Sequence, residues 1–210
     1  MESAELNQCM RNALTRVMGH SDELRDLDQA IGDGDLGITI TVGAEAVIAA
    51  LEQLDSTAQP SDIVRACAKA FANANPSTMA ALVAGALIAG SRVWAGKTDI
   101  SVTDAAAFVK VGGEAIALRG KTQLGDKTIL DAIMPAADAL AEHEDDAAAA
   151  LDAAIAAAER AVIETTQLQS QRGRAAWLQE RSIGAPDPGA TAFLRFLQSW
   201  KAGNDDGETD

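Results

Sequence analysis

The 210-residue sequence has few aromatic side chains (3%), no tyrosine and only two cysteines, Cys9 and Cys67. Sheets usually pack on aromatic and β-branched side chains, whereas alanine, which dominates here, packs closely between helices. Two cysteines do not make a disulfide framework, and both fall on apolar helical faces, so we expect small core residues. The shortage of aromatics therefore favours an all-α fold with one sizeable core.

Basic residues are also in the minority, since 17 Lys and Arg face 31 Asp and Glu for a formal net charge of −14. This charge argues against a nucleic-acid partner and against an anionic membrane surface, and it would repel a free nucleotide unless metal ions neutralise the local field. Glu2 and Glu5 replace the basic start of a signal peptide, and no apolar run reaches membrane-spanning length. We expect one cytoplasmic domain over residues 1–202 and a disordered acidic tail over residues 203–210.

Apolar residues recur at helical spacing along most of the chain, without hairpin signals or βαβ alternation. Apolar and polar side chains alternate over residues 38–42, as in a β-strand, so the sequence does not decide between helix and strand at this point. Pro135 is expected to bend the helix that contains it. The periodicity predicts helices through residues 6–31 with a pause at Gly19, 40–54, 60–71, 78–94, 101–116, 126–140, 146–164 and 193–200.

Three acids and two glycines stand close together after the first helical stretch. Gly32 lets the chain leave the helix and Gly34 permits backbone angles that other residues resist, so Asp33 and Asp35 can turn back toward Asp28. Three acids without a basic neighbour would resist ionising, and a hard cation such as Mg²⁺ removes that conflict. Asp and Gly are also the commonest turn residues, so spacing alone leaves an exposed loop equally open.

Two later stretches have features of an anion site. Residues 124–128 place a glycine, an acid and a hydroxyl at an expected helix start, where free N–H groups attract anions, although an ordinary helix cap is the simpler interpretation. Residues 167–188 form a long polar connection without a helical pattern, which is typical of a lid or binding loop. In it, Arg174 could clamp a phosphate. Trp177 could either pin the loop to the core or contact a base.

Taken together, these stretches resemble the nucleotide-binding L subunit of dihydroxyacetone kinase. Their order, their separations and the chain length all fit, so the resemblance covers residues 1 to about 200. It is carried by Asp28 with Gly32-Asp33-Gly34-Asp35, by residues 124–129 with Asp131 and Pro135, by Gly173-Arg174 through Glu180-Arg181-Ser182-Ile183-Gly184, and by Asp187-Pro188-Gly189-Ala190-Thr191.

The resemblance implies an antiparallel barrel of eight helices with the nucleotide held at one end. It implies that Asp28, Asp33 and Asp35 hold two Mg²⁺ ions that bridge the diphosphate of ADP or ATP. A lid over residues 173–189 would close on the nucleotide. The other nucleotide-binding positions that it implies are Thr39, Ser77 and Thr78 for the phosphates, Gly125, Thr128 and Ile129 around the adenine, Arg174 at the phosphates, and Asp187, Pro188 and Gly189 at the end of the lid.

The sequence departs from the family pattern at three places. Leu36 and Thr39 stand where a histidine and an asparagine are usual, and Ala185 replaces another histidine. Residues 75–78, Asn-Pro-Ser-Thr, replace a glycine-rich turn. These departures concern the phosphoryl donor, the partner and the sugar more than the binding of the nucleotide.

The family's sugar-binding histidine belongs to a separate K subunit, and His20 and His143 lie in polar contexts here. The resemblance therefore implies a glycerone kinase subunit without catalytic residues of its own, which presents ATP to dihydroxyacetone, or to a related short ketose, held by a K-type partner. The nucleotide would exchange with free ATP or be rephosphorylated by a phosphotransferase-system protein. A non-catalytic, nucleotide-sensing regulatory module is the alternative.

Overall fold

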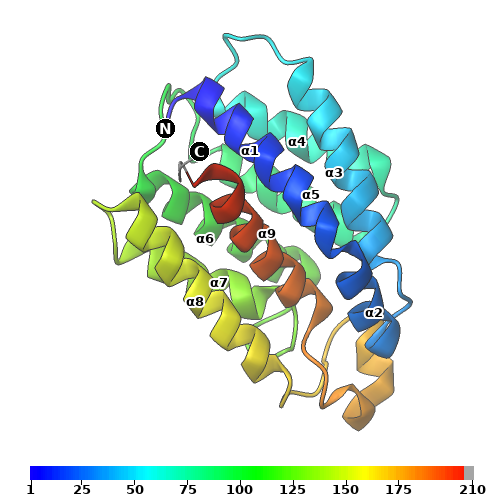
Figure 1. Cartoon of the computed structure of the whole chain (residues 1–210). Coiled ribbons are helices and arrows are strands. Elements are labelled where there is room, and N and C mark those ends of the chain that lie inside the picture. Colours follow the sequence, from blue (N-terminus) through cyan, green and yellow to red (C-terminus); the bar gives the residue numbers. More distant parts are fainter. Residues whose placement is uncertain (206–210) are drawn as a thin grey trace, which may run out of the picture.

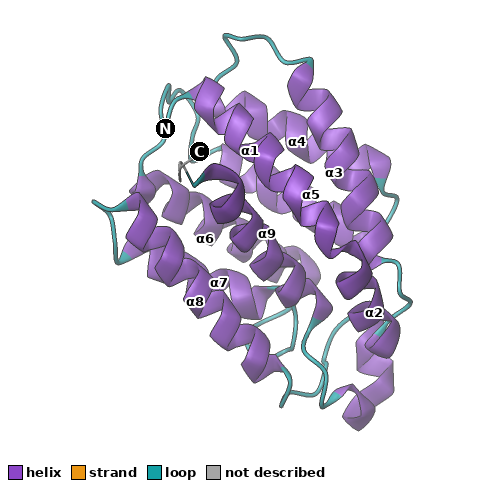
Figure 2. Cartoon of the chain, in the orientation of Figure 1, coloured by secondary structure: helices purple, strands orange, loops and turns teal. Residues whose placement is uncertain are grey.

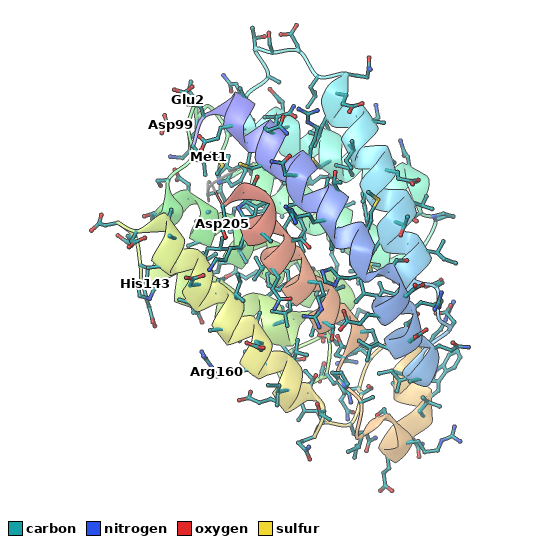
Figure 3. All side chains as sticks on the ribbon, in the orientation of Figure 1. Met1, Glu2, Asp99, His143, Arg160 and Asp205 are labelled. Atoms are coloured by element: carbon teal, nitrogen blue, oxygen red, sulfur yellow. The ribbon has the colours of Figure 1, made fainter. Side chains whose placement is uncertain are left out.

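The computed structural model describes residues 1–205, which are helical with no β-strand (Figure 1 and Figure 2). Near the N-terminus, Met1 and Glu2 lie beside Asp99, and Glu2 and Asp99 form one isolated antiparallel bridge (Figure 3). The elements are α1 (Ser3–Val17), η1 (Met18–His20), α2 (Ser21–Ile31), α3 (Leu36–Glu52), α4 (Pro60–Ala74), α5 (Thr78–Ser91), α6 (Val102–Gly120), α7 (Leu130–Ala141), α8 (Ala147–Thr165), η2 (Arg174–Ser182) and α9 (Pro188–Asn204).

Eight of these helices close into a ring. From α3 to α9 each helix packs against the next, α9 packs against α1, and α1 packs against α3. The short helix α2 continues α1 through the turn η1 and extends the ring at one end, where it packs on α3 (Figure 1). The eight-helix antiparallel barrel implied by the resemblance is confirmed, with α1 and α2 together as its first member.

Alanine allows one wall of the barrel to pack closely. The interface of α7 and α8 is built on Ala132 and Ala136 from one helix and Ala154 and Ala158 from the other, all fully buried. Side chains that end at Cβ let two helix backbones approach and lose no rotamer freedom on burial. The high alanine content of the sequence thus accounts for the close packing of α7 against α8.

Larger side chains fill the wall formed by α4, α5 and α6. Trp94 stacks on Phe108 with ring centroids 4.4 Å apart, and its Nε1 donates to the carbonyl of Asp104 at 3.0 Å. Phe71 and Cys67 pack in the same cluster. Burial raises the pKa of the Cys67 thiol to about 12, as fits a small core residue. Cys9 is half-buried.

Most predicted helix starts are confirmed. Ser101 and Asp104 form the expected capping box of α6, and Pro60 is the first residue of α4. The strand-like residues 38–42 lie inside α3, so that ambiguity is resolved in favour of a helix. Pro135 lies within α7. None of the described helices has the length and apolar character that crossing a membrane requires.

Two predicted boundaries were wrong, and one connection contains a helix that was not predicted. Helix α5 ends at Ser91, before Trp94, because Trp94 turns out of the helix to stack on α6. Helix α7 begins at Leu130 and not at Asp126, because the residues before it form a tight turn around buried carboxylates. The connection after α8 contains the 3₁₀ helix η2, whose apolar residues are too few to give a periodic signal.

The final helix reaches into the segment expected to be a tail. Helix α9 ends at Asn204, whose side-chain amide donates to the carbonyls of Cys9 and Trp200 at 3.1 and 2.8 Å. The bond to Cys9 fastens the end of α9 to α1, and residues 203 and 204 are part of this helix. Residues 206–210 of the expected tail lie outside the described residues.

Candidate functional site

Three acidic side chains converge where α2 meets α3. Carboxylate oxygens of Asp28, Asp33 and Asp35 all lie within 4.8 Å of one another. Asp28 is half-buried in the last turn of α2, and the other two acids are exposed. Three carboxylates at this separation form the kind of oxygen donor set that a divalent cation binds. The structure brings together the residues that the sequence singled out as metal ligands.

The glycines of this turn give the acids their positions. A Cβ atom at Gly32 would overlap Oδ1 of Asp28, so a larger residue there would displace the carboxylate. Gly34 has φ +77°, in the left-handed region that favours glycine. Oδ2 of Asp28 accepts the backbone N–H of Leu36 at 3.2 Å, which fixes the carboxylate across the turn. Helix α2 ends at Ile31 with Gly32 as its C-cap residue, so the chain leaves the helix at Gly32 as expected, and the positive φ of Gly34 also agrees with its expected role.

Arg174 reaches the acids from the far end of the sequence and forms an ion pair with Asp33. It opens η2, which packs against α2 and is the orange segment beside the end of α2 in Figure 1. The sequence alone showed a group of acids without a basic neighbour, but the fold supplies one. A guanidinium that reaches this cluster also has the geometry for a two-point contact with phosphate.

The turn between α4 and α5 lies against the start of α3. Buried Asn75 donates from Nδ2 to the carbonyl of Thr39 at 3.2 Å, which holds the two elements together. Ser77 caps α5 and accepts the N–H of Ala80 on Oγ at 3.1 Å, so its hydroxyl proton remains a donor. Thr78 is the exposed first residue of α5. Hydroxyl donors therefore stand at a helix N-terminus, where anions are stabilised.

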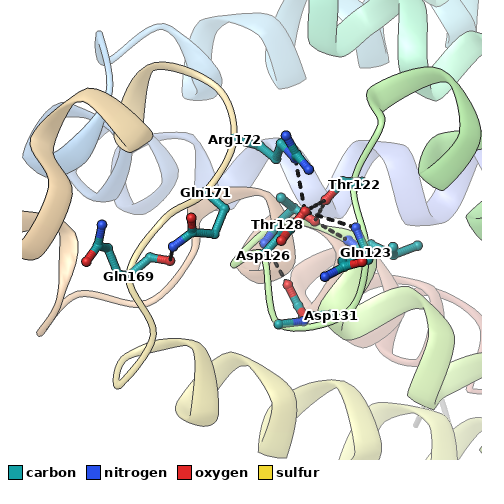
Figure 4. Close-up of polar contacts among 10 residues, drawn as sticks. Thr122, Gln123, Asp126, Thr128, Asp131, Gln169, Gln171 and Arg172 are labelled. Carbon is teal, nitrogen blue, oxygen red and sulfur yellow. Dashed lines mark hydrogen bonds and ion pairs between the residues drawn. The ribbon is translucent and has the colours of Figure 1, made fainter.

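The turn before α7 is built around the buried carboxylate of Asp131 (Figure 4). This carboxylate accepts the N–H of Gly125 at 2.5 Å and the N–H of Thr128 at 2.7 Å. Gly125 has φ +88°, and its N–H turns inward to meet the acid. The N–H groups of Gly125 and Thr128 are therefore paired with Asp131 and not free for an anion, whereas the side chains of Thr128 and Ile129 remain partly exposed.

A second carboxylate, Asp126, links the same turn to the connection after α8 (Figure 4). Its Oδ2 accepts the N–H of Gln123 at 3.0 Å and the Nε of Arg172 at 2.9 Å, and its carbonyl accepts the N–H of Gln171 at 2.9 Å. Burial works against ionisation of Asp126, but the bonds from Gln123 and Arg172 outweigh it, and its pKa is lowered. Asp126 is therefore a charged anchor for the connection.

The start of α9 packs on this turn. Asp187 caps the helix by accepting the N–H of Ala190 at 2.7 Å, and a Cβ on Gly189 would lie 3.3 Å from Cβ of Ile129. Burial raises the pKa of Asp187 to about 7, and the neighbouring charge of Asp131 adds to this effect. The start of α9 thus lies beside Ile129, and Asp187 and Pro188, which the resemblance implies as nucleotide-binding residues, are buried. Their contribution to a ligand site is through the position of the helix start.

Packing brings these turns to one end of the barrel. Leu24 of α2, Leu36 of α3 and Ala192 of α9 form a small core cluster, against which Met79 of α5 packs. These contacts bring α2, α3, α5 and α9 together at one end of the barrel, and η2 lies at the same end, beside α2 (Figure 1).

An ion pair between α2 and α9 supports this arrangement. Arg195 of α9 donates to Glu23 of α2 through Nε and Nη2, at 2.7 and 2.5 Å. The bond from Arg195 holds the pKa of Glu23 below its usual value. A two-point contact of this kind fixes the relative position of two helices that carry site residues.

Two further predictions concern aromatic and histidine side chains. Trp177 in η2 is 83% exposed, so it does not pin the connection to the core. His143 lies in the turn between α7 and α8, away from the acids (Figure 3), and His20 lies in η1 within 3.5 Å of Glu23. Neither histidine joins the acid cluster.

Lys127, which no sequence feature singled out, is buried between the α6–α7 turn and the connection that carries Arg174. A lysine next to an acid at a helix start looks like an ordinary surface residue. A left-handed backbone, with φ +59°, turns its side chain inward, and no sequence signal marks this conformation for a residue other than glycine.

The chain is similar in sequence to known proteins. The sequence model of the DAK2 domain matches residues 30–202. The ADP-binding subunit DhaL of the PEP-dependent dihydroxyacetone kinase of Escherichia coli is 28% identical over 85% of this chain and 86% of its own length. The corresponding subunit of kinase 1 from Listeria innocua is 34% identical over 83% of each chain.

Longer proteins match as well. The L-erythrulose 1-kinase of Mycolicibacterium smegmatis is 34% identical over 84% of this chain, which spans only 31% of that enzyme. The crystal structure of the dihydroxyacetone kinase from C. freundii with AMP-PNP and Mg²⁺ superposes with a TM-score of 0.76 at 19% identity, covering 95% of this chain and 34% of the other. The structural match shows the shared fold.

Proposed function

Because this chain belongs to the DAK2 domain family, we propose that it is the nucleotide-binding subunit of a dihydroxyacetone-type kinase. The observation that carries the proposal is the meeting of three carboxylates with Arg174 at one end of the barrel. A site that combines carboxylates for cations with an arginine for phosphate suits a nucleoside diphosphate bound with metal. Two relatives of similar length are named as ADP-binding subunits, which supports the same ligand.

The acid cluster fits divalent cations. All three donors are carboxylate oxygens, Asp28 is held in place by Leu36, and Gly32 leaves room for its Oδ1. Asp28, Asp33 and Asp35 would hold two Mg²⁺ ions. When bound, Mg²⁺ supplies the charge that neutralises the diphosphate and stabilises the leaving oxygen of the transferred phosphoryl group.

The remaining residues orient the nucleotide. Arg174 exchanges its pairing with Asp33 for a contact with phosphate, and the hydroxyls of Ser77, Thr78 and Thr39 donate to phosphate oxygens. Gly125, Thr128 and Ile129 border the adenine together with the start of α9. Residues 173–189 cover the ligand and exclude water, which strengthens these electrostatic contacts.

The sugar is held elsewhere. Neither histidine of the chain lies at the acid cluster, so we propose that a K-type partner subunit binds the ketose and that this chain transfers the γ-phosphoryl group to it. Relatives named for dihydroxyacetone and for L-erythrulose indicate a short ketose as the acceptor. The PEP-dependent relatives support rephosphorylation of bound ADP by a phosphotransferase-system protein, while exchange with free ATP is the other route.

The test measures binding and transfer separately. Calorimetry of the purified chain with ADP should give binding that requires Mg²⁺ and disappears in Asp33→Asn, whereas Asp26→Asn, which changes an exposed acid of α2 outside the cluster, should bind normally. Mg²⁺-independent binding, or no loss in Asp33→Asn, would overturn the proposed site.

Transfer is then measured with ATP and either dihydroxyacetone or erythrulose, with and without a K-type subunit. Sugar phosphate formed only with the partner supports the kinase function. Tight nucleotide binding without transfer in the presence of a K-type subunit active with another L subunit would instead support a non-catalytic, nucleotide-sensing module.

A further inference from the structure

Lys127 is the largest side chain that is fully buried in the described part of the chain, with 1% of its surface exposed. Lysine is rarely buried to this extent, because a buried ammonium group loses its hydration. Its N–H donors must then find acceptors in the protein to offset that loss. Burial accordingly lowers the pKa of Lys127, and the nearby charge of Asp187 opposes this change. A buried ammonium of this kind needs an explanation in terms of its partners.

The ammonium group of Lys127 donates to three backbone carbonyls. Nζ lies 3.0 Å from the oxygen of Leu168, 2.5 Å from that of Ser182 and 2.7 Å from that of Ala185. These bonds use all three donors of an ammonium group. Leu168 belongs to the stem that leaves α8, whereas Ser182, the last residue of η2, and Ala185 lie where the chain returns toward α9, so one side chain joins both stems of the connection.

Other bonds fasten the same stems to one another. The N–H of Ser170 donates to Oγ of Ser182 at 2.9 Å, and the N–H of Gly184 donates to the carbonyl of Thr166 at 2.8 Å. Between these cross-links, η2 projects outward with Arg174 and the exposed Trp177, and it packs against α2. The connection thus has two parts. The neck consists of the two cross-linked stems, residues 166–170 and 182–185, and Lys127 bonds to both of them. The tip is the part of η2 that carries Arg174 and Trp177.

The base of this neck is the turn assigned to the adenine. Lys127 lies between Gly125 and Thr128, which are both fixed by the carboxylate of Asp131. Its φ of +59° turns the side chain away from that surface and into the neck. The turn at residues 125–128 therefore has two contacts. Its backbone borders the proposed adenine position, and the side chain of Lys127 bonds to both stems of the lid.

We propose that Lys127 is a positioning residue, which fixes both stems of the lid to the adenine turn so that Arg174 reaches the phosphate end of a bound nucleotide. The inference rests on the proposed function for the identity of the ligand, a metal-bound adenine nucleotide. The three carbonyl oxygens converge on one point, which suits the compact ammonium group of lysine. The guanidinium of arginine is planar, so its N–H donors could not point at all three oxygens from one atom.

The first experiment tests the lid without any nucleotide. Trypsin cleaves after Arg174 and Arg181, which are exposed at the tip, at a rate set by the population of opened lid. In Lys127→Met this cleavage should be faster by about tenfold or more, a factor that corresponds to about 1.4 kcal/mol. Lys121→Met is the matched control, since Lys121 also has a positive φ, +50°, but its side chain is exposed.

The second experiment measures ADP with Mg²⁺ by calorimetry and by stopped-flow displacement. Lys127→Met should bind ADP about tenfold more weakly, through faster dissociation, while Lys121→Met resembles the wild type. Lys127→Arg keeps the charge and should show the same direction of change. If Lys127→Met does not fold, as judged by circular dichroism, Lys127→Arg decides both measurements.

The outcomes separate the two proposals. Folded variants with wild-type cleavage at the tip and wild-type ADP dissociation would overturn the role of Lys127. Faster cleavage at the tip with unchanged ADP dissociation would also overturn it, because the residue would then serve only the fold. A wild-type protein that fails to bind ADP would refute the proposed function, while the cleavage comparison would still report whether Lys127 fixes the lid.

Discussion

Arg174 and Asp33 form an ion pair although α3 to α8 separate them in the chain. The pair places the guanidinium at a carboxylate that is also a proposed metal ligand. If Asp33 binds a divalent cation as proposed, Arg174 and the cation would compete for it, and a phosphate would offer the arginine a new partner.

Arg174→Gln should change metal and nucleotide binding in opposite directions. Without ADP, Mn²⁺ should bind up to about fivefold more tightly, because an exposed pair of this kind is worth up to about 1 kcal/mol. With ADP and Mg²⁺, binding should weaken by about ten- to a hundredfold, as expected when a charged hydrogen bond is lost. Electron paramagnetic resonance of Mn²⁺ and calorimetry of ADP measure the two effects. Arg181→Gln, in the same 3₁₀ helix, is the control, and equal behaviour of both variants would contradict the competition.

Gly32→Ala should damage the acid cluster selectively. The added methyl would overlap Oδ1 of Asp28, so the carboxylate must turn away from Asp33 and Asp35. We expect Mg²⁺-dependent ADP binding to weaken by about tenfold or more, equivalent to about 1.4 kcal/mol. Gly19→Ala is the matched variant, since a Cβ there meets nothing within 4 Å. If calorimetry gave the same ADP affinity for both variants, Asp28 would not be a ligand.

Asp187→Asn should remove a pH dependence of stability. The pKa of Asp187 is raised from 3.8 to about 7 by burial and by Asp131, so above pH 4 the unfolded chain loses a proton that the folded protein keeps. The contribution of this group to the free energy of unfolding therefore falls as the pH rises from about 4 to 7 and is then constant. Each pKa unit corresponds to about 1.4 kcal/mol, so the total is a few kcal/mol.

Urea unfolding of the wild type and of Asp187→Asn at several pH values measures this contribution. The asparagine keeps an oxygen acceptor for the N–H of Ala190 and does not titrate. The difference in unfolding free energy between the two proteins should drift in favour of the asparagine variant from pH 4 to 7. A difference that is constant over this range would show that Asp187 ionises normally.

Gly43→Ala should destabilise the barrel wall between α3 and α4. A Cβ at this position would overlap the ring of Phe71 and would lie 2.9 Å from Nδ2 of Asn75, whose amide holds the carbonyl of Thr39. Overpacking of this kind costs about 1–3 kcal/mol. In Gly112→Ala the new Cβ would lie 3.6 Å from its nearest neighbour, the carbonyl oxygen of Ala86, so that variant should unfold at the wild-type denaturant concentration or above. Guanidinium titration compares the two.

Local patterns in the sequence were enough to predict the helices and the acid cluster. Apolar spacing depends on neighbours within one or two turns, so it located all eight members of the barrel, and the capping box at Ser101 was visible in the same way. Gly32 and Gly34 marked the turn that gathers Asp28, Asp33 and Asp35, because a glycine reports on its own backbone. The order of these short motifs also carried the family resemblance.

What the sequence could not determine depends on contacts between residues far apart in the chain. The start of α7 was misplaced because the carboxylate of Asp131 folds residues 125–128 into a turn, and the pairing of Arg174 with Asp33 exists only once η2 lies on α2. The burial of Lys127 was unpredictable for the same reason, since its acceptors on Leu168, Ser182 and Ala185 reach it only when α9 closes the ring. Helical periodicity is a local property of the chain, whereas the partners of a charged side chain are set by the tertiary fold.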